Sequence, residues 1–325
     1  MSTEAQKAQW KAALERRLGA GRIETDLPLA PFTTFKIGGP ADLVFRARTA
    51  GELVAAITAA GELRIATFLL GKGANILVGD GGFRGLVIRI EVGGILFLEG
   101  NRVRVGAGVE VFPELIQATV ERGLGGLHHF AGIPSTVGGA IWQNLHFLSP
   151  APDRARTIFI EEVVESAEIL TEEGRIAEVD RAYFRFGYDF SILHERSDVV
   201  LNVTFLLEKG DPDVLRQVIE ENLRWRAERH PDLELSPSAG SIFKKVEGIG
   251  AGRLIDECGL KGRVQGGAQI FPRHANIIVN LGNATAADVL TLIELAGETV
   301  LRETGHALVP EITLVGDFEG RPPRR

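Results

Sequence analysis

The chain has 325 residues, of which 45% are hydrophobic and 24% are charged, so it is long enough for two domains with buried cores. A net charge of −7 argues against a general nucleic-acid or membrane-surface role, although it is compatible with a local basic pocket for a small anion. The single cysteine, Cys258, excludes an intramolecular disulfide and a multi-cysteine metal site, and we expect no metal.

The N-terminal segment reads as an extension of the main fold. Residues 1–10 are polar and lack the apolar core of a signal peptide. No later run is as long as a membrane span, which needs about eighteen apolar residues. We therefore expect a cytoplasmic protein. Residues 4–18 have the spacing of an amphipathic helix that ends at glycines, and we assign residues 1–25 to an N-terminal extension.

The most informative stretch is Leu69 to Asp80, which reads LLGKGANILVGD. It follows a strand predicted at 41–47 and a helix predicted at 51–61, and it joins two further strands by a glycine turn. Successive free N–H groups in such a turn form a concave site for an anion such as pyrophosphate. A plain glycine-rich β-turn is the competing interpretation. No helix pattern follows Asn75, which excludes a Rossmann fingerprint and a Walker loop, and Lys72 alone is typical of a solvated turn lysine.

A second motif of similar character is AGIPSTVGGAIWQN at residues 131–144, which follows a helix predicted at 112–124. We interpret it as a loop whose small residues let the backbone approach a flat or phosphorylated ligand, with Ser135 and Thr136 as additional donors. A tight-packing turn is the competing interpretation, but it explains only the glycine pair Gly138-Gly139 and not the rest of the motif. Residues 145–160 are predicted to be an irregular loop.

The second half of the chain alternates strands and helices. A long helix is predicted after a break at Gly210-Asp211-Pro212 and up to about His230, and we place a domain boundary near Lys209. The part beyond it is predicted to be an α+β domain, followed by a disordered tail at 319–325. The other predicted strands and helices are at 86–90, 95–98, 103–105, 163–170, 175–179, 199–207, 253–258, 277–281, 284–305 and 311–315.

Eight motifs, in one order over nearly the whole chain, resemble the UDP-N-acetylenolpyruvoylglucosamine reductases of peptidoglycan synthesis. They are TTFKIGGPA, LLGKGANILVGD, GIPSTVGGAIWQN, FGYDFSIL, SAGSIFKK, AGRLIDECGLKG, RHANIIVN and PEITLVG. The resemblance implies an α+β chain with an FAD-binding fold of the vanillyl-alcohol-oxidase (PCMH) type, in subdomains at about 26–92 and 93–209, and a substrate-binding domain at 210–318. It also implies that NADPH reduces FAD and that the flavin passes hydride to the enolpyruvyl double bond, giving UDP-N-acetylmuramate.

An enol ether conjugated to a carboxylate accepts hydride only if the developing charge is stabilised and then protonated. By its motif, Ser241 resembles the family's proton-donating serine, and Glu311 resembles its catalytic glutamate. Without the resemblance, the first is typical of a turn hydroxyl and the second of an exposed acid at a strand end.

The resemblance also implies the binding residues. Those expected at the flavin are Thr34, Gly71, Lys72, Gly73, Ala74, Asn75, Ile76, Ile133, Ser135, Thr136 and Gly139. Those expected at the UDP-sugar are Tyr188, Arg226, Arg229, Lys244 and Lys245. Arg226 and Arg229 lie one helical turn apart and share a face, for which a solvated helix surface is the competing interpretation.

The chain departs from the family pattern at three places. Asp189 stands where relatives carry the arginine that steadies the intermediate, Leu145-His146-Phe147 replaces a Gly-Ala-Tyr type of turn, and Lys245 stands where some relatives carry asparagine. We expect Asp189 to turn away and Arg185 or Arg196 to supply the missing charge. The alternatives are a slow reductase, an FAD oxidoreductase of the same fold with another substrate, and a flavin-binding protein without turnover. No obligate protein partner is inferred.

Overall fold

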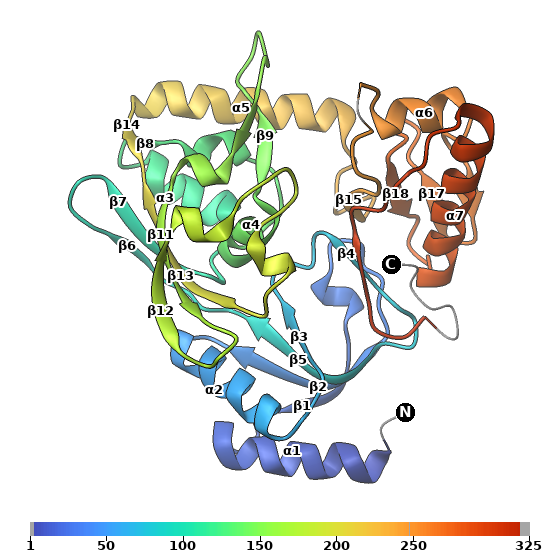
Figure 1. Cartoon of the computed structure of the whole chain (residues 1–325). Coiled ribbons are helices and arrows are strands. Elements are labelled where there is room, and N and C mark those ends of the chain that lie inside the picture. The colour runs from blue at the N-terminus through green and yellow to red at the C-terminus, as the bar shows by residue number, and fades with distance from the viewer. Residues whose placement is uncertain (1–2, 247, 319–325) are drawn as a thin grey trace.

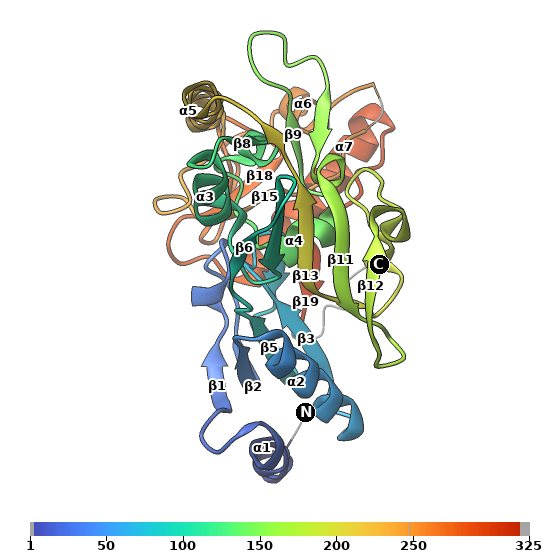
Figure 2. The same cartoon turned by 90° about the vertical axis from the view of Figure 1, so that its left-hand side faces the viewer.

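The computed structural model describes residues 3–246 and 248–318, so the expected tail lies outside the described residues. In Figure 1 the first subdomain (blue and cyan) lies below the second (green and yellow), and the C-terminal domain (orange and red) stands beside both. Figure 2 shows the sheets of the two subdomains one above the other. No helix in the described part of the chain is long and apolar enough to cross a membrane.

The first subdomain is a four-stranded sheet in the order β1-β2-β5-β3, in which β2 and β3 both run parallel to β5. Thr49 caps the helix that crosses between β2 and β3 by accepting a hydrogen bond from the Glu52 N–H, and Leu53, Ala56 and Ala60 bury its apolar face. The elements are α1 (Glu4–Leu18), β1 (Glu24–Pro28), β2 (Pro40–Ala47), α2 (Ala50–Glu62), β3 (Thr67–Leu70), β4 (Ile76–Val78) and β5 (Phe83–Ile90).

The second subdomain is a five-stranded antiparallel sheet in the order β12-β11-β13-β7-β6. Its central strand β13 is buried along almost its whole length, as the weak alternation of its residues predicts. The helix expected at 112–124 is shorter, because a wide turn at Val111–Leu115 precedes it. The elements are β6 (Ile95–Phe97), β7 (Arg102–Gly106), α3 (Ile116–Val120), β8 (Leu124–Gly125), α4 (Val137–Gln143), β11 (Val164–Leu170), β12 (Ile176–Asp180), β13 (Val199–Leu206) and β14 (Glu208–Lys209).

Two segments expected to be loops contain regular structure. The motif at 131–144 ends in α4, because Thr136 accepts a hydrogen bond from the Gly139 N–H and so caps a short helix. The segment 145–160 contains the hairpin β9 (His146–Leu148) and β10 (Thr157–Phe159), whose strands pair from His146–Phe159 to Leu148–Thr157. Both prolines of that segment fall in the connection between the strands, where they remove no ladder hydrogen bond.

Helix α5 (Pro212–Arg229) connects the second subdomain to the C-terminal domain along one edge of the molecule (Figure 1). Asp211 caps it, and Pro212 occupies its first turn. The predicted boundary near Lys209 assigns this helix to the C-terminal domain. Its residues Leu215, Ile219 and Trp225, however, pack into the core of the second subdomain.

The C-terminal domain carries a four-stranded sheet in the order β15-β18-β17-β16, covered by α6 and α7. The last strand, β19 (Thr313–Val315), leaves this domain and pairs in parallel with β4, directly after the glycine turn (Figure 1). That pairing fixes the C-terminal domain beside the turn. The elements are β15 (Ser238–Ser241), α6 (Ala251–Glu257), β16 (Val264–Gln265), β17 (Ala268–Ile270), β18 (Ile277–Asn280) and α7 (Ala286–Thr304).

Candidate active site

The glycine turn between β3 and β4 presents a row of free backbone donors. The N–H groups of residues 71–75 donate to no acceptor within the described residues, and the buried side-chain nitrogen Nδ2 of Asn75 also has no partner there. Thr34 fixes the turn from outside, because its N–H and Oγ1 donate to the Gly73 carbonyl at 3.1 and 3.4 Å. A row of unpaired N–H groups is the arrangement that binds a phosphate oxygen.

The two glycine motifs meet at this turn. A Cβ on Gly71 would lie 2.6 Å from Oγ1 of Thr136, and a Cβ on Gly73, whose φ is +63°, would lie 2.5 Å from the Phe32 carbonyl oxygen. These glycines are therefore required by close approach as well as by backbone conformation. The cradle between the motifs fits a phosphate-bearing cofactor.

Other predicted flavin residues have partners within the protein. Lys72 forms an ion pair with Glu110, so it is not a freely solvated turn lysine. Oγ of Ser135 donates to the Thr136 carbonyl at 2.9 Å, and Ile133 packs against the core of the second subdomain. These contacts order the walls of the cradle.

Ser241 and Glu311 are brought together by paired backbone segments. The Glu311 N–H donates to the Ile242 carbonyl at 2.7 Å, and the Lys244 N–H donates to the Val309 carbonyl at 2.8 Å. The Ser241 hydroxyl makes no hydrogen bond within the described residues. A turn hydroxyl would bond locally, as Ser238 does by accepting from the Gly240 N–H at 3.4 Å, so the turn interpretation does not describe Ser241.

Asn276 holds the Ser241 segment in place, and sequence analysis missed it. Its side-chain Nδ2 donates to the Phe243 carbonyl at 2.8 Å, and its Oδ1 accepts from the Phe243 N–H at 3.0 Å. Its own carbonyl accepts from the Ile242 N–H at 2.8 Å. The motif RHANIIVN contains this residue, but we predicted only a strand from it.

Glu311 lies in a site where the neutral carboxyl is favoured. Burial and, less strongly, the nearby Asp189 raise the pKa of Glu311 to about 8, while Lys244 opposes the shift. The neutral carboxyl is therefore favoured at neutral pH, and in that form it can donate a hydrogen bond. The same influence places the Asp189 carboxyl within electrostatic range of the C-terminal domain.

Asp189 sits at the corner of a tight turn in which Gly187 and Phe190 are bridged. The turn is held on α4, because Nδ2 of Asn144 donates to the Gly187 carbonyl at 2.9 Å and Oγ of Ser191 donates to the Trp142 carbonyl at 2.8 Å. Asp189 is buried, and both of its carboxylate oxygens lack a hydrogen-bond partner in the described structure. Its carboxylate lies near enough to Glu311 to raise the pKa of that group, which argues against the expectation that it turns away.

Tyr188 lies beside Asp189 and stays half-exposed. Partial burial raises the pKa of Tyr188 to about 12, with Asp189 and Glu311 adding to the shift.

The two arginines expected to replace the missing charge do not pair with Asp189. Nε of Arg196 donates to Asp198 at 2.7 Å, and its Nη2 lies 3.0 Å from Glu172, so it serves the turn between β11 and β12. Arg185 is exposed at the end of a short 3-10 helix and makes no ion pair with any described residue. Compensation by Arg185 or Arg196 therefore stays a prediction, although Arg196 is already engaged by carboxylates of the protein.

A second group of cations gathers on α5. The Arg226 guanidinium lies 5.7 Å from the Phe147 ring centre, and burial lowers its pKa to about 10, yet it has no ion pair or hydrogen bond with a described residue. Arg229 lies over Trp225 and pairs with Glu228. The tip of the β9–β10 hairpin contributes a cation that sequence analysis missed, Arg154, which lies 5.1 Å from the Trp225 ring centre.

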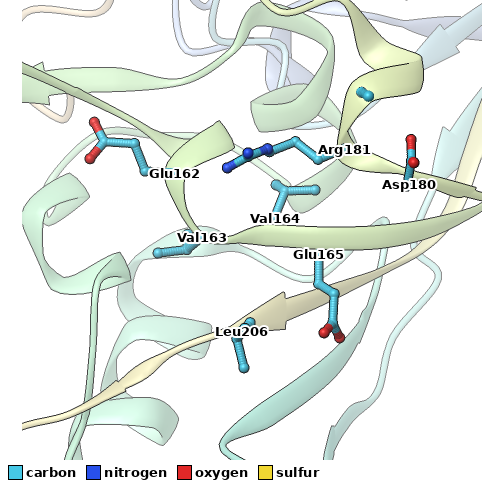
Figure 3. Close-up of a pocket in the computed structure, with 8 residues that line it drawn as sticks. Glu162, Val163, Val164, Glu165, Asp180, Arg181 and Leu206 are labelled. Carbon is cyan, nitrogen blue, oxygen red and sulfur yellow. The ribbon is translucent and has the colours of Figure 1, made fainter.

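One predicted substrate residue has no partner in the protein, and one hollow contains no predicted residue. Lys245 is exposed and has no side-chain partner in the described part of the chain. A hollow of about 370 Å³ at the start of β11 and the end of β12 is lined by Glu162, Val164, Glu165, Arg181 and their neighbours (Figure 3). It contains no predicted site residue.

Comparison with known proteins places the whole arrangement. Residues 230–315 match the family model of the UDP-N-acetylenolpyruvoylglucosamine reductase C-terminal domain, and residues 41–180 match that of an FAD-binding domain, which confirms the predicted fold class. The chain is 40% identical to the UDP-N-acetylenolpyruvoylglucosamine reductase of Moorella thermoacetica, over 91% of this chain and 94% of that protein. It is 37% identical to the corresponding protein of Pediococcus pentosaceus, over 89% and 93%. A crystal structure of the Thermus caldophilus reductase superimposes with a TM-score of 0.73 at 32% identity, over 90% of this chain and 99% of that one. The chain therefore belongs to the UDP-N-acetylenolpyruvoylglucosamine reductase family.

Proposed function

We propose that this protein reduces UDP-N-acetylenolpyruvoylglucosamine to UDP-N-acetylmuramate, at the expense of NADPH, in peptidoglycan precursor synthesis. The observation that carries the proposal is the placement of Ser241, Lys244 and Glu311 on paired segments next to β19, which itself pairs with β4 after the glycine turn. A proton donor, a cation and a protonated carboxyl thus stand beside a cofactor cradle. The use of two nucleotides, NADPH and a UDP-sugar, is the reason to keep a cytoplasmic location within this proposal.

The cofactor cradle is assigned to FAD. When bound, FAD accepts hydride from NADPH and delivers it to the vinyl carbon of the substrate. The N–H groups of residues 71–75 and Nδ2 of Asn75 bind its pyrophosphate, because they are the donors that lack protein acceptors. Thr34 positions this turn, and Ser135, Thr136 and Gly139 form the facing wall.

Two residues manage charge and protons at the reacting centre. As hydride arrives at the vinyl carbon, negative charge builds on the adjacent carbon and its carboxylate. Glu311, protonated at neutral pH, donates a hydrogen bond to that carboxylate, and Lys244 adds a positive charge. The Ser241 hydroxyl donates its proton to the adjacent carbon and regains one from solvent.

The diphosphate of the UDP moiety is assigned to the arginines on α5. A partly buried guanidinium without a counter-ion is destabilising unless a ligand supplies the anion, and Arg226 is in that state. Arg229 lies one turn further along the helix, at the exposed side of the same group. Tyr188 and Lys245 are kept as binding residues of the sugar side.

Anaerobic stopped-flow absorbance of the FAD-loaded protein tests the proposal. NADPH should bleach the flavin, and UDP-N-acetylenolpyruvoylglucosamine should then restore its colour. The presence of an acid, Asp189, where the family pattern has an arginine favours the second candidate, an FAD oxidoreductase with another substrate. Bleaching without recovery on addition of this substrate would support that candidate, and failure to bleach would support a flavin-binding protein without turnover.

A further inference from the structure

The buried carboxylate of Asp189 is not explained by the turn that contains it. Its φ of +52° lies in the left-handed region, which Asp and Asn tolerate better than other non-glycine residues. That preference accounts for the backbone, but an asparagine or a glycine would satisfy it without burying a charge. The Asp189 side chain is 1% exposed, and neither oxygen has a hydrogen-bond donor in the described structure. A buried charge of this kind is costly unless an opposite charge faces it.

The one basic group within 4 Å of Asp189 among the described residues is His146. Its Nδ1 lies 3.5 Å from Oδ1 of Asp189. His146 comes from β9, in the hairpin that sequence analysis predicted to be a loop. Two of the departures from the family pattern, at residues 145–147 and at 189, therefore contact each other.

The surroundings of His146 fix its ring and leave one nitrogen free. The ring packs between Tyr188 and Phe159, with ring centres 4.8 and 5.3 Å away. Its Nδ1 faces Asp189, its side chain keeps 23% of its surface exposed, and its Nε2 bonds to no described residue. An imidazole held by a carboxylate on one nitrogen presents the other to a ligand in a defined direction.

The neighbouring histidine, His194, is not a competing candidate. Its ring stacks on Trp142 at 3.6 Å, and its Nε2 lies 3.0 Å from the Trp142 carbonyl oxygen. Both contacts engage it with α4.

We propose that His146, held by Asp189, is the cationic hydrogen-bond donor that faces the carboxylate of the substrate, in the role that the family pattern gives to an arginine at position 189. The inference rests on the proposed function, because it takes the substrate to carry a carboxylate beside Glu311. The ionisable groups around the pair are Tyr188 on the same turn, His194 beyond it, and Glu311 and Lys244 from the C-terminal domain. An anionic substrate next to Asp189 would be repelled, and an imidazolium between the two carboxylates removes that repulsion.

Ligand binding to the oxidised, FAD-loaded protein tests this without turnover. UDP-N-acetylmuramate carries the carboxylate, whereas UDP-N-acetylglucosamine lacks it. By calorimetry, His146→Gln should weaken the binding of UDP-N-acetylmuramate by about tenfold or more and leave that of UDP-N-acetylglucosamine unchanged. The matched control is His306→Gln, which should change neither affinity, since among the described residues His306 bonds only to Thr304, two positions earlier in the chain.

The outcomes separate this inference from the proposed function. If the native protein binds neither ligand, the proposed function fails. If it binds both and His146→Gln binds UDP-N-acetylmuramate as tightly as the native protein does, the inference on His146 fails. Equal weakening of both ligands would also overturn it, because the variant would then have lost the site as a whole.

The role of Asp189 is tested by a second substitution. In His146→Gln the Asp189 carboxylate faces the ligand without a cation, so adding Asp189→Asn should recover part of the lost affinity for UDP-N-acetylmuramate. In the native background Asp189→Asn should not improve binding. Equal effects of Asp189→Asn in both backgrounds would show that the two residues are uncoupled, which would overturn the inference that they act as a pair.

Discussion

The two sides of the site are built by different means. The cofactor side consists largely of backbone N–H groups from five consecutive residues, 71–75. The proposed substrate side consists of side chains from segments far apart in the chain, among them His146, Asp189, Arg226 and Glu311. A backbone cradle follows from a contiguous motif, whereas a side-chain constellation exists only once the fold has assembled it. The two sides should therefore respond to different substitutions.

Ser241→Ala should give the largest effect, because it should slow the half-reaction of the substrate side and leave that of NADPH unchanged. The hydroxyl is unpaired within the described residues, and in the proposed reaction it serves only protonation of the substrate carbon, so reoxidation of the reduced flavin should slow by about 10²-fold or more. Reduction by NADPH should keep its rate. Stopped-flow absorbance of each half-reaction measures both, and Ser197→Ala, at an exposed position, is the control. Equal loss in both half-reactions would identify Ser241 as a structural residue.

On the cofactor side, Gly73→Ala should weaken FAD binding by about 10-fold to 100-fold. The new methyl group would meet the Phe32 carbonyl oxygen at 2.5 Å, in a left-handed conformation that alanine disfavours. Fluorescence titration of the apoprotein with FAD measures the affinity. Gly174→Ala shares the left-handed strain, with φ +79°, but meets no atom within 4 Å, so it isolates the crowding at the cradle. If both variants bind FAD like the native protein, the cradle is not the pyrophosphate site.

The fold could be predicted from sequence where local pattern decides structure. The strands on either side of the glycine turn and the long helix α5 follow from hydrophobic spacing and turn residues. The β9–β10 hairpin could not, because each strand has only three residues and prolines lie between them. Nor could the pairing of β19 with β4, which joins Leu77 to Leu314 across most of the chain. Such pairing depends on tertiary packing that no local pattern encodes.

The same limit applies to the site. Ser241 and Glu311 stand in motifs, and the motifs were enough to propose them. His146, Asn276 and Arg154 were missed, because each matters only through a partner distant in sequence, such as Asp189 for His146. The departures at 145–147 and 189 were visible in the sequence. The contact between His146 and Asp189 is what indicates a role for His146, and only the structure shows that contact.

On the substrate side, Arg226→Gln should weaken the binding of UDP by about tenfold. The guanidinium is partly buried without an anion, so its loss should remove the proposed ligand contact and no protein ion pair. Calorimetry with UDP measures the effect. Arg224→Gln is the matched control, because Arg224 is exposed on the same helix and also lacks an ion pair with any described residue. Equal effects of the two substitutions would favour the solvated helix face that sequence analysis left open.

The smallest expected effect concerns Glu311 and the pH dependence of stability. The pKa of Glu311 is raised from 4.5 to about 8 in the folded protein, so between these values the folded state holds a proton that the unfolded state has lost. The contribution of Glu311 to the free energy of unfolding is fully present below about pH 4.5 and is lost as pH rises toward 8. Glutamine cannot ionise, so Glu311→Gln should melt like the native protein at pH 4.5 and about 2 °C or more above it at pH 8.

Thermal unfolding of the FAD-loaded proteins followed by circular dichroism provides the measurement, with Glu298→Gln, at an exposed position of α7, as the control. A shift of the same size at both pH values would mean that Glu311 titrates normally. The substrate side would then hold an ionised carboxylate beside Asp189, and Glu311 would be unable to donate a hydrogen bond to the substrate at neutral pH.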